Sequence, residues 1–167
     1  MFITTVTPSI AGNTYLGWGA VNMQGAIVDT ACAIAIESQD QSIDMDIVPV
    51  SDINRDGQGR AKPFSIELVN CVVERQEGRK ADWKQFQITF DGDAEGDLFG
   101  VRGEASGVAL QITDKGGNIV APGRPLPRED ITSENMRLNY YISLVANQHT
   151  LKVGEYFSAV RFKLDYF

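Results

Sequence analysis

Alternation of apolar and polar residues with a period of two is the feature that most constrains this chain. Such a period places successive side chains on opposite faces of an extended strand, so each alternating segment predicts a β-strand with one face in a core. Breakers rich in glycine, proline, asparagine and aspartate separate most of them, and no window of twelve residues has a clear helical period. The alternating segments are 21–27, 64–69, 85–90, 108–113, 138–145 and 156–167.

Many short strands with turn signals between them predict an all-β sandwich or barrel. We expect helical turns at most at 48–53 and at 128–136. The length of 167 residues and the 43% of hydrophobic residues fit one globular domain.

Composition excludes several classes of function. The formal charge of −7 without a basic run argues against binding to nucleic acid. No apolar stretch reaches the length of a membrane-spanning helix. One histidine, His149, and two cysteines leave little material for a zinc site or a Cys/His catalytic pair. We therefore predict no metal and no cofactor.

No constellation of an enzyme stands out either. Residues 91–97 begin like a calcium loop, but the twelfth position, which needs a bidentate acid, is Arg102, so we predict a solvated acidic hairpin. His149 lies in a polar stretch in which no partner nucleophile or acid can be singled out. Asp44 and Asp46 alternate with apolar residues and indicate one exposed strand face. The sequence predicts a protein that is not an enzyme and has no small-molecule substrate.

The two cysteines, Cys32 and Cys71, lie 39 positions apart, each inside an apolar run typical of a strand. Two readings stay open from these residues: a disulfide between adjacent strands, or two free buried thiols. A disulfide would imply an oxidising compartment.

The two ends of the chain are unusual. Residues 1–11 are uncharged and mildly apolar, with small residues at 9 and 11 as before a signal-peptidase site, but no basic segment precedes them. They are either the remnant of a signal peptide or an extended arm. Residues 15–25 are apolar and rich in glycine, and 156–167 form a long alternating strand. The two terminal strands either pair within one chain or add to strands of other chains.

Several motifs in this order resemble the pilins of the chaperone–usher pathway, the subunits of type 1 and P pili. They are the run from Gly25 to Ile34, Ile43-Asp44-Met45, the run from Phe64 to Cys71, the run from Phe86 to Gly92, and the run from Gly107 to Ile112. The end of the chain resembles the C-terminal signature of that family, with a glycine fourteenth from the end (Gly154), an alternating strand and a penultimate tyrosine (Tyr166). The resemblance covers roughly residues 15–167.

The resemblance implies an incomplete immunoglobulin-like β-sandwich that lacks its last strand. A periplasmic chaperone fills the resulting groove first, and the N-terminal extension of the next subunit then replaces it by donor-strand exchange. It also implies a disulfide between Cys32 and Cys71. We expect an arm over residues 1–24 and a pilin domain over 25–167. The donor positions would be Tyr15, Gly17, Gly19, Val21 and Met23, and the groove strand would present Gly154, Tyr156, Val160, Phe162, Leu164 and Tyr166.

Within the family, the arm with Tyr15 and Trp18 is most similar to the subunit that terminates the P-pilus rod at its base. The alternatives are an ordinary rod or adaptor pilin and, from another class, a secreted monomeric β-sandwich that binds a ligand. The pilin reading implies a chaperone, an outer-membrane usher and neighbouring pilins as partners, with passage through the periplasm to a fimbrium on the bacterial cell surface.

Overall fold

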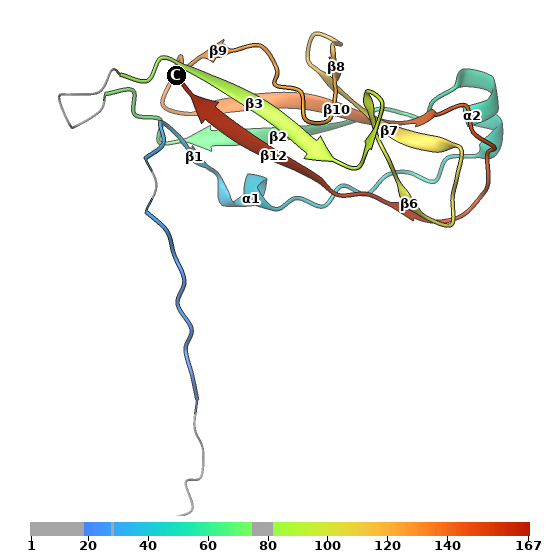
Figure 1. The fold of residues 1–167 in the computed structure, drawn as a ribbon, viewed down its shortest axis with the longest axis horizontal. Coiled ribbons are helices and arrows are strands. Elements are labelled where there is room, and N and C mark those ends of the chain that lie inside the picture. The colour runs from blue at the N-terminus through green and yellow to red at the C-terminus, as the bar shows by residue number, and fades with distance from the viewer. Residues whose placement is uncertain (1–18, 28, 75–81) are drawn as a thin grey trace, which may run out of the picture.

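The computed structural model describes residues 19–27, 29–74 and 82–167 and is almost entirely β-structure (Figure 1). The larger sheet has the order β1-β2-β10-β7-β5-β4, with β8 also paired to β7. A second sheet has the order β12-β3-β9, and β11 pairs with β6 in a third. The prediction of an all-β chain is confirmed. The strands are β1 (Ala33–Ile34), β2 (Lys62–Val69), β3 (Gln85–Gly92), β4 (Ala94–Glu95), β5 (Leu98–Phe99), β6 (Arg102–Gly103), β7 (Val108–Asp114), β8 (Ile119–Val120), β9 (Glu129–Asp130), β10 (Met136–Ala146), β11 (Tyr156–Phe157) and β12 (Val160–Tyr166).

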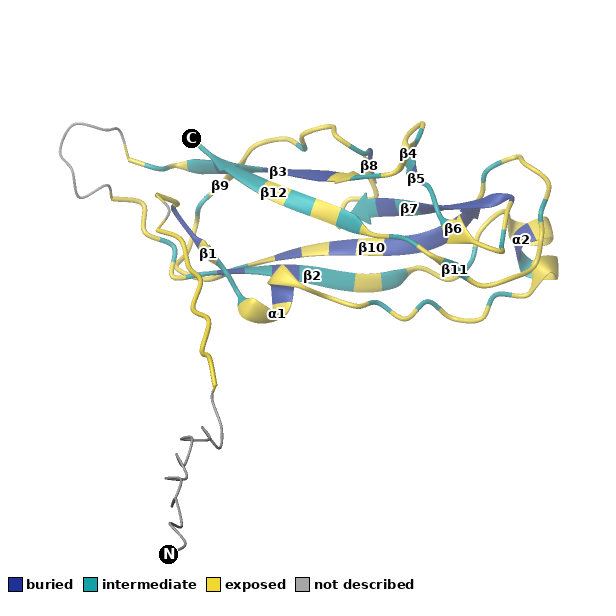
Figure 2. Cartoon of the chain, turned by 60° about the horizontal axis from the view of Figure 1, so that its bottom comes forward, coloured by how far each residue is buried: buried dark blue, intermediate teal, exposed yellow. Residues whose placement is uncertain are grey.

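The strands form two layers with the core between them. Figure 2 shows β3 and β12 in one layer and β2, β10 and β7 in the other, with buried residues in both layers. All pairings are antiparallel, and they set Phe64 opposite Tyr140 and Phe162 opposite Phe90. The ring of Phe90 meets that of Tyr140 edge to face, with the centroids 5.0 Å apart. Aromatic side chains from both layers therefore join across the core, which is the arrangement that the alternating pattern requires.

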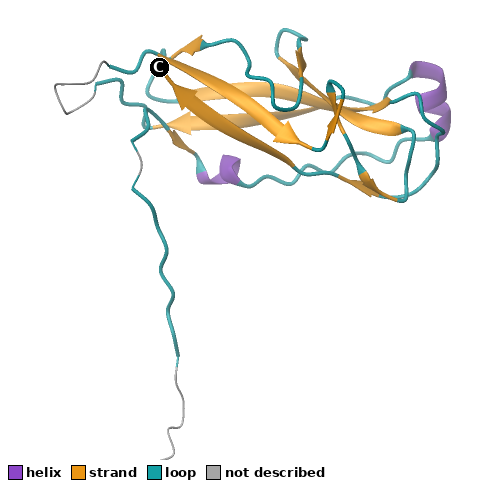
Figure 3. Ribbon diagram, viewed as in Figure 1, coloured by secondary structure: helices purple, strands orange, loops and turns teal. Residues whose placement is uncertain are grey.

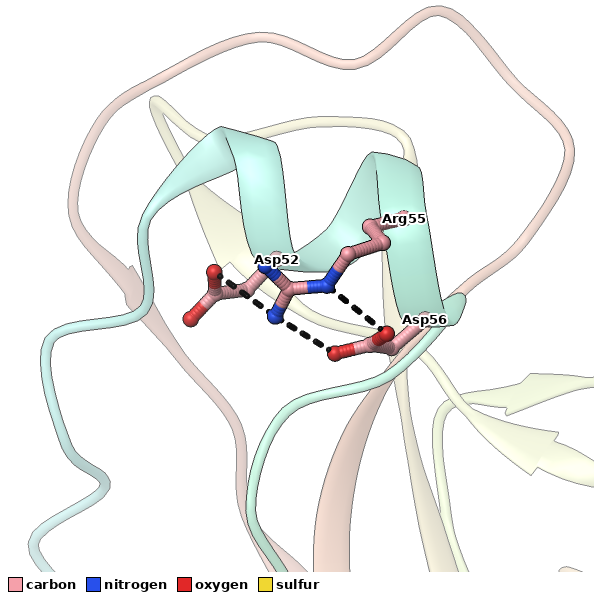
Figure 4. Close-up of polar contacts among 3 residues, drawn as sticks. All are labelled: Asp52, Arg55 and Asp56. Atoms are coloured by element: carbon pink, nitrogen blue, oxygen red, sulfur yellow. Dashed lines mark hydrogen bonds and ion pairs between the residues drawn. The ribbon is translucent and has the colours of Figure 1, made fainter.

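The described domain has two short helices (Figure 3): α1 (Ile36–Gln39), which lies beneath the sheets, and α2 (Val50–Asp56), which lies at one end. Helix α2 buries Ile53 and ends at Asp56, and the following Gly57 adopts a left-handed conformation and donates its backbone N–H to the Ile53 carbonyl at 2.9 Å. On its surface, Arg55 pairs with Asp52 at 3.3 Å and Asp56 at 2.9 Å (Figure 4). These exposed pairs contribute little stability.

Three segments differ from the sequence-based predictions. Residues 21–27 alternate like a strand but join no sheet. The C-terminal strand is divided into β11, which pairs with β6, and β12, which pairs with β3, and between them the Ser158 hydroxyl donates to the Gly100 carbonyl at 2.8 Å. The segment 128–136 contains β9 instead of a helical turn, whereas the turn expected at 48–53 is present as α2.

The acidic segment 91–97 is a hairpin, as predicted. Strands β4 and β5 pair across a turn in which Gly96 has a positive φ of 63°. Arg102, at the position where a calcium loop needs an acid, donates its Nε–H to Asp93 Oδ2 at 2.8 Å. Within the described residues, no group of three or more acids, histidines and cysteines is placed to hold a metal ion. No described helix has the length and apolar character needed to cross a membrane.

Candidate functional site

A groove of about 1080 Å³ runs along one side of the sandwich. One wall is the segment 38–50, and the other is the segment 151–160 together with Phe162. The floor consists of apolar side chains from β2, β3, β7 and β10, most of them buried: Phe64, Ile66, Phe90, Val108, Leu110, Ile112, Ile142 and Leu144. The core of the sandwich is therefore open to the outside between these two walls.

The two walls leave hydrogen-bonding edges unused. Strand β12 stands at the end of its sheet, with β3 as its neighbour, so in the described part of the chain its other edge faces the groove. The opposite segment, 40–49, is extended but belongs to no strand. Edges of this kind are templates for an added strand, which would also cover the apolar floor. The geometry is that of a sandwich with one strand missing.

Inward residues of the C-terminal strand form part of the groove. Val160 and Phe162 are half-buried, line the cavity and pack against the core, and the Phe162 ring lies 6.1 Å from that of Phe90. Leu164 and Tyr166 lie on the same face and pack against the core, but they are not among the residues that line the cavity. The groove strand is thus open at its start and covered at its end.

Tyr166 closes that covered end against the disulfide. Its hydroxyl donates to the Cys32 carbonyl at 3.2 Å, and its ring lies 5.8 Å from that of Trp83. Burial raises the pKa of this phenol. Cys32 and Cys71 form a disulfide with 4.0 Å between their Cα atoms, beside the pairing of Ala33 with Val69 in β1 and β2. The predicted bridge is present and lies next to the last core residue of β12.

Tyr156 lines the other part of the groove. Its hydroxyl oxygen is buried and has no hydrogen-bond partner among the described residues. Burial raises the pKa of this phenol, and the negative charge of Asp46 across the groove adds to the shift. Asp46 itself pairs with Lys62, with 2.9 Å between Nζ and Oδ1. The groove is therefore apolar at its floor and charged at its rim.

The model of the fimbrial protein family matches residues 21–166. The chain belongs to this family. Two relatives from Escherichia coli, the PRS and PAP fimbrial minor pilin proteins, are each 34% identical over 162 residues, covering 95% of this chain and 83% of theirs. The fimbria A protein of Serratia marcescens is 29% identical and covers 95% of this chain and 90% of its own.

Solved structures support the fold of this fimbrial protein. The P pilus rod subunit PapA superimposes with a TM-score of 0.71 at 21% identity, covering 83% of this chain and all of that one. A subunit of a chaperone–usher pilus, solved to explain rod uncoiling, gives 0.72 at 24% identity over 94% of this chain and all of its own. The incomplete immunoglobulin-like sandwich is thus confirmed. The protein is a structural pilus subunit, and its family is not a family of enzymes.

The predicted donor positions that the structure describes, Gly19, Val21 and Met23, lie apart from the groove. Tyr15 and Gly17 are outside the described residues. Val21 and Met23 are 84% and 90% exposed, and Gly19 has no atom within reach of an added Cβ. The described part of this arm extends away from the domain (Figure 1). The fimbrial protein therefore does not fill its own groove with Gly19, Val21 or Met23.

Of the residues that the sequence predicts for the groove strand, Gly154, Tyr156, Val160 and Phe162 line the cavity and Leu164 and Tyr166 do not, and the opposite wall was not predicted. Segment 38–50 is held by contacts that no local pattern reveals, such as the Ser38 hydroxyl accepting the Glu67 N–H at 2.9 Å. The one available signal was the alternation in 43–46, where Ile43 and Met45 pack against the core while Asp44 and Asp46 are exposed.

Gly154, the glycine of the C-terminal signature, is required by a close crossing of two segments. Its φ is 152°, and a Cβ there would lie 2.5 Å from Glu104 Cβ and 2.9 Å from the Ala105 nitrogen. We expect Gly154→Ala to destabilise the fimbrial protein by about 3 kcal/mol, because backbone strain and steric overlap add. Urea unfolding measures the change. Gly117→Ala is the control, since Gly117 also has a positive φ but no atom near the added Cβ, and should cost only about 1 kcal/mol. Equal effects of the two variants would contradict the steric argument.

Proposed function

We propose that the groove accepts a donated β-strand, first from a periplasmic chaperone and, in subunits that propagate a fibre, from a neighbouring pilin. The observation that carries this proposal is the apolar groove of about 1080 Å³ beside the unused edge of β12. Backbone hydrogen bonds to β12 would give affinity, and alternate side chains would cover the floor. An outer-membrane usher would receive the complex after its passage through the periplasm.

Residues 12–24 are proposed as the strand that this subunit donates, within an arm over 1–24 followed by the pilin domain over 25–167. The high exposure of Val21 and Met23 supports this role, because apolar residues in alternation are costly to leave in water. Gly19 and, before it, Tyr15 and Gly17 would continue the same face. Residues 1–11 are a remnant of a signal peptide or the start of this arm.

Replacing Gly19 with a large residue should block donation without harming the subunit. A glycine within a strand marks close approach of another backbone, so Gly19→Trp should prevent insertion into the preceding subunit. The fold should survive, because nothing lies within 4 Å of a Cβ at this position. Incorporation into fibres, followed by immunoblotting of sheared pili, measures donation. Ala20→Trp, on the opposite face of the same segment, is the matched control and should incorporate. Normal incorporation of Gly19→Trp would refute the donor assignment.

We further propose that this is a minor subunit that ends the rod at its base. Its 34% identity to two proteins named minor pilins supports this role over that of an ordinary rod or adaptor subunit. A terminating subunit donates its arm to the rod but keeps the chaperone strand in its own groove. No further subunit can then join.

Donor-strand exchange tests the terminating role. The purified complex of this subunit with its chaperone is mixed with donor-strand peptides from the same pilus system, and release of the chaperone is followed by native electrophoresis. We expect the complex to persist, whereas the rod subunit of the same system, as control, exchanges. Deletion of the gene should lengthen the fibres. Rapid exchange would identify a propagating subunit and leave the groove assignment standing.

A further inference from the structure

The groove wall formed by segment 38–50 is acidic along its outer side. Asp44 and Asp46 are exposed and alternate with Ile43 and Met45, which pack against the core. In a filled groove, the outward residues of the added strand would lie beside these two carboxylates. Among the charged residues that line the groove, the acids are Asp40, Asp44, Asp46 and Glu155, and the base is Lys152.

The cations around the groove leave part of this negative charge uncompensated. Lys62 pairs with Asp46 at 2.9 Å and donates to the backbone carbonyl of Asp44, so it does not reach the Asp44 carboxylate in the described structure. On the opposite wall, the two outward cations of β12 have acids of their own, and Lys152 can offset only one of the four groove-lining acids. Arg161 pairs with Asp91 at 3.4 Å and Lys163 with Asp165 at 3.1 Å. An acidic excess therefore remains at Asp40 and Asp44.

The chain's own arm does not match this charge. Residues 1–24 contain no lysine, arginine, aspartate or glutamate, and the outward face of the proposed donor strand offers Ala20, Asn22 and Gln24. If a second copy donated this arm, it would cover the carboxylates without pairing them. Opposite charges on neighbouring strands stabilise a sheet. An added strand with lysine or arginine at its outward positions would form such pairs with the groove carboxylates.

We infer that the groove selects a strand of another protein in which apolar residues alternate with lysine or arginine, and that it disfavours the arm of a second copy. The inference rests on the proposed function, since it requires that the groove accept a strand. The apolar face of the added strand would supply most of the affinity. Its basic outward face would make it bind more tightly than a strand without these charges. With two cross-strand pairs, the preference should be about five-fold in affinity.

Competition between peptides tests this selectivity. The oxidised full-length chain is refolded with a fluorescent strand peptide that carries glutamine at its outward positions. Three unlabelled peptides with the same apolar face and lysine, glutamine or glutamate outward, and a peptide of residues 12–24, then compete for the groove. We expect lysine to compete about five-fold better than glutamine at low salt, and glutamate and the 12–24 peptide to compete no better than glutamine. The advantage of lysine should fall below about two-fold at 0.5 M salt, because screening weakens exposed pairs.

A pair of charge-matched variants locates the effect. Asp40→Asn with Asp44→Asn should remove the preference for lysine. Glu129→Gln with Glu134→Gln removes the same net charge from exposed positions outside the groove and should retain it. Equal competition by the lysine and glutamine peptides, or better competition by the 12–24 peptide, would overturn the inference while leaving the groove as a strand acceptor. If the chain binds none of the peptides, whatever their charge, both this inference and the proposed function are refuted.

Discussion

Phe162→Ala is expected to abolish capture of this subunit by the periplasmic chaperone that we propose as its first partner. The side chain lines the groove, lies opposite Phe90 in the β12–β3 pairing and packs against the core. Loss of a core phenylalanine costs about 3–5 kcal/mol, and the lower end applies here because the ring is half-buried in the empty groove. Small domains have only about 5–15 kcal/mol in total, and this one lacks a strand.

Co-purification with the chaperone from periplasmic extracts measures the effect of Phe162→Ala. Tyr141→Ala is the matched control, because Tyr141 is an aromatic residue on the exposed face of β10, away from the groove. The control should be captured as the unaltered chain is. An undiminished yield of chaperone complex for Phe162→Ala would show that this residue is not part of the captured surface.

Loss of the disulfide should cost about 4 kcal/mol. Cys32 and Cys71 close a loop with a sequence separation of 39, and the chain-entropy model gives this value for a loop of such length. Urea unfolding of the oxidised chain, with and without dithiothreitol, measures it. The variant Cys32→Ala with Cys71→Ala should resemble the reduced chain and be indifferent to the reductant. The oxidised chain should take up no alkylating agent until it is reduced. The argument fails if reductant leaves the unfolding midpoint of the unaltered chain unchanged.

The strands that frame the sandwich could be predicted because their alternation reflects burial on one face. Segments 64–69, 85–90, 108–113 and 138–145 all fall within strands β2, β3, β7 and β10. Residues 21–27 have the same pattern and form no strand in the chain alone. Alternation records that a segment can pair, but it carries no information about whether its partner lies in the same chain.

The groove could be predicted only in part, because its two walls come from distant parts of the sequence. The wall at Val160 and Phe162 followed from the C-terminal pattern and the family resemblance. The wall at 38–50 depends on contacts such as that between Ser38 and Glu67, which local patterns do not encode. The cysteines posed the same difficulty. Only the pairing of Ala33 with Val69 brings Cys32 and Cys71 close enough to bond.

The sheet that carries β12 has a kinetic consequence. The β12–β3 ladder joins Val160 to Gly92 and Tyr166 to Phe86, so every contact of this ladder closes a loop of roughly 70–80 residues. Ladders of such high contact order form slowly, because the entropy of loop closure is lost before the contacts stabilise the product. The nearer pairing of β7 with β10 can form sooner, whereas the β2–β10 ladder closes loops as long as those of β12 with β3, so the first product is a two-stranded ribbon without its cover. A folding chain should therefore pass through a partly folded state that exposes apolar strand faces. Whether such a chain aggregates or completes its fold depends on how soon these faces are covered.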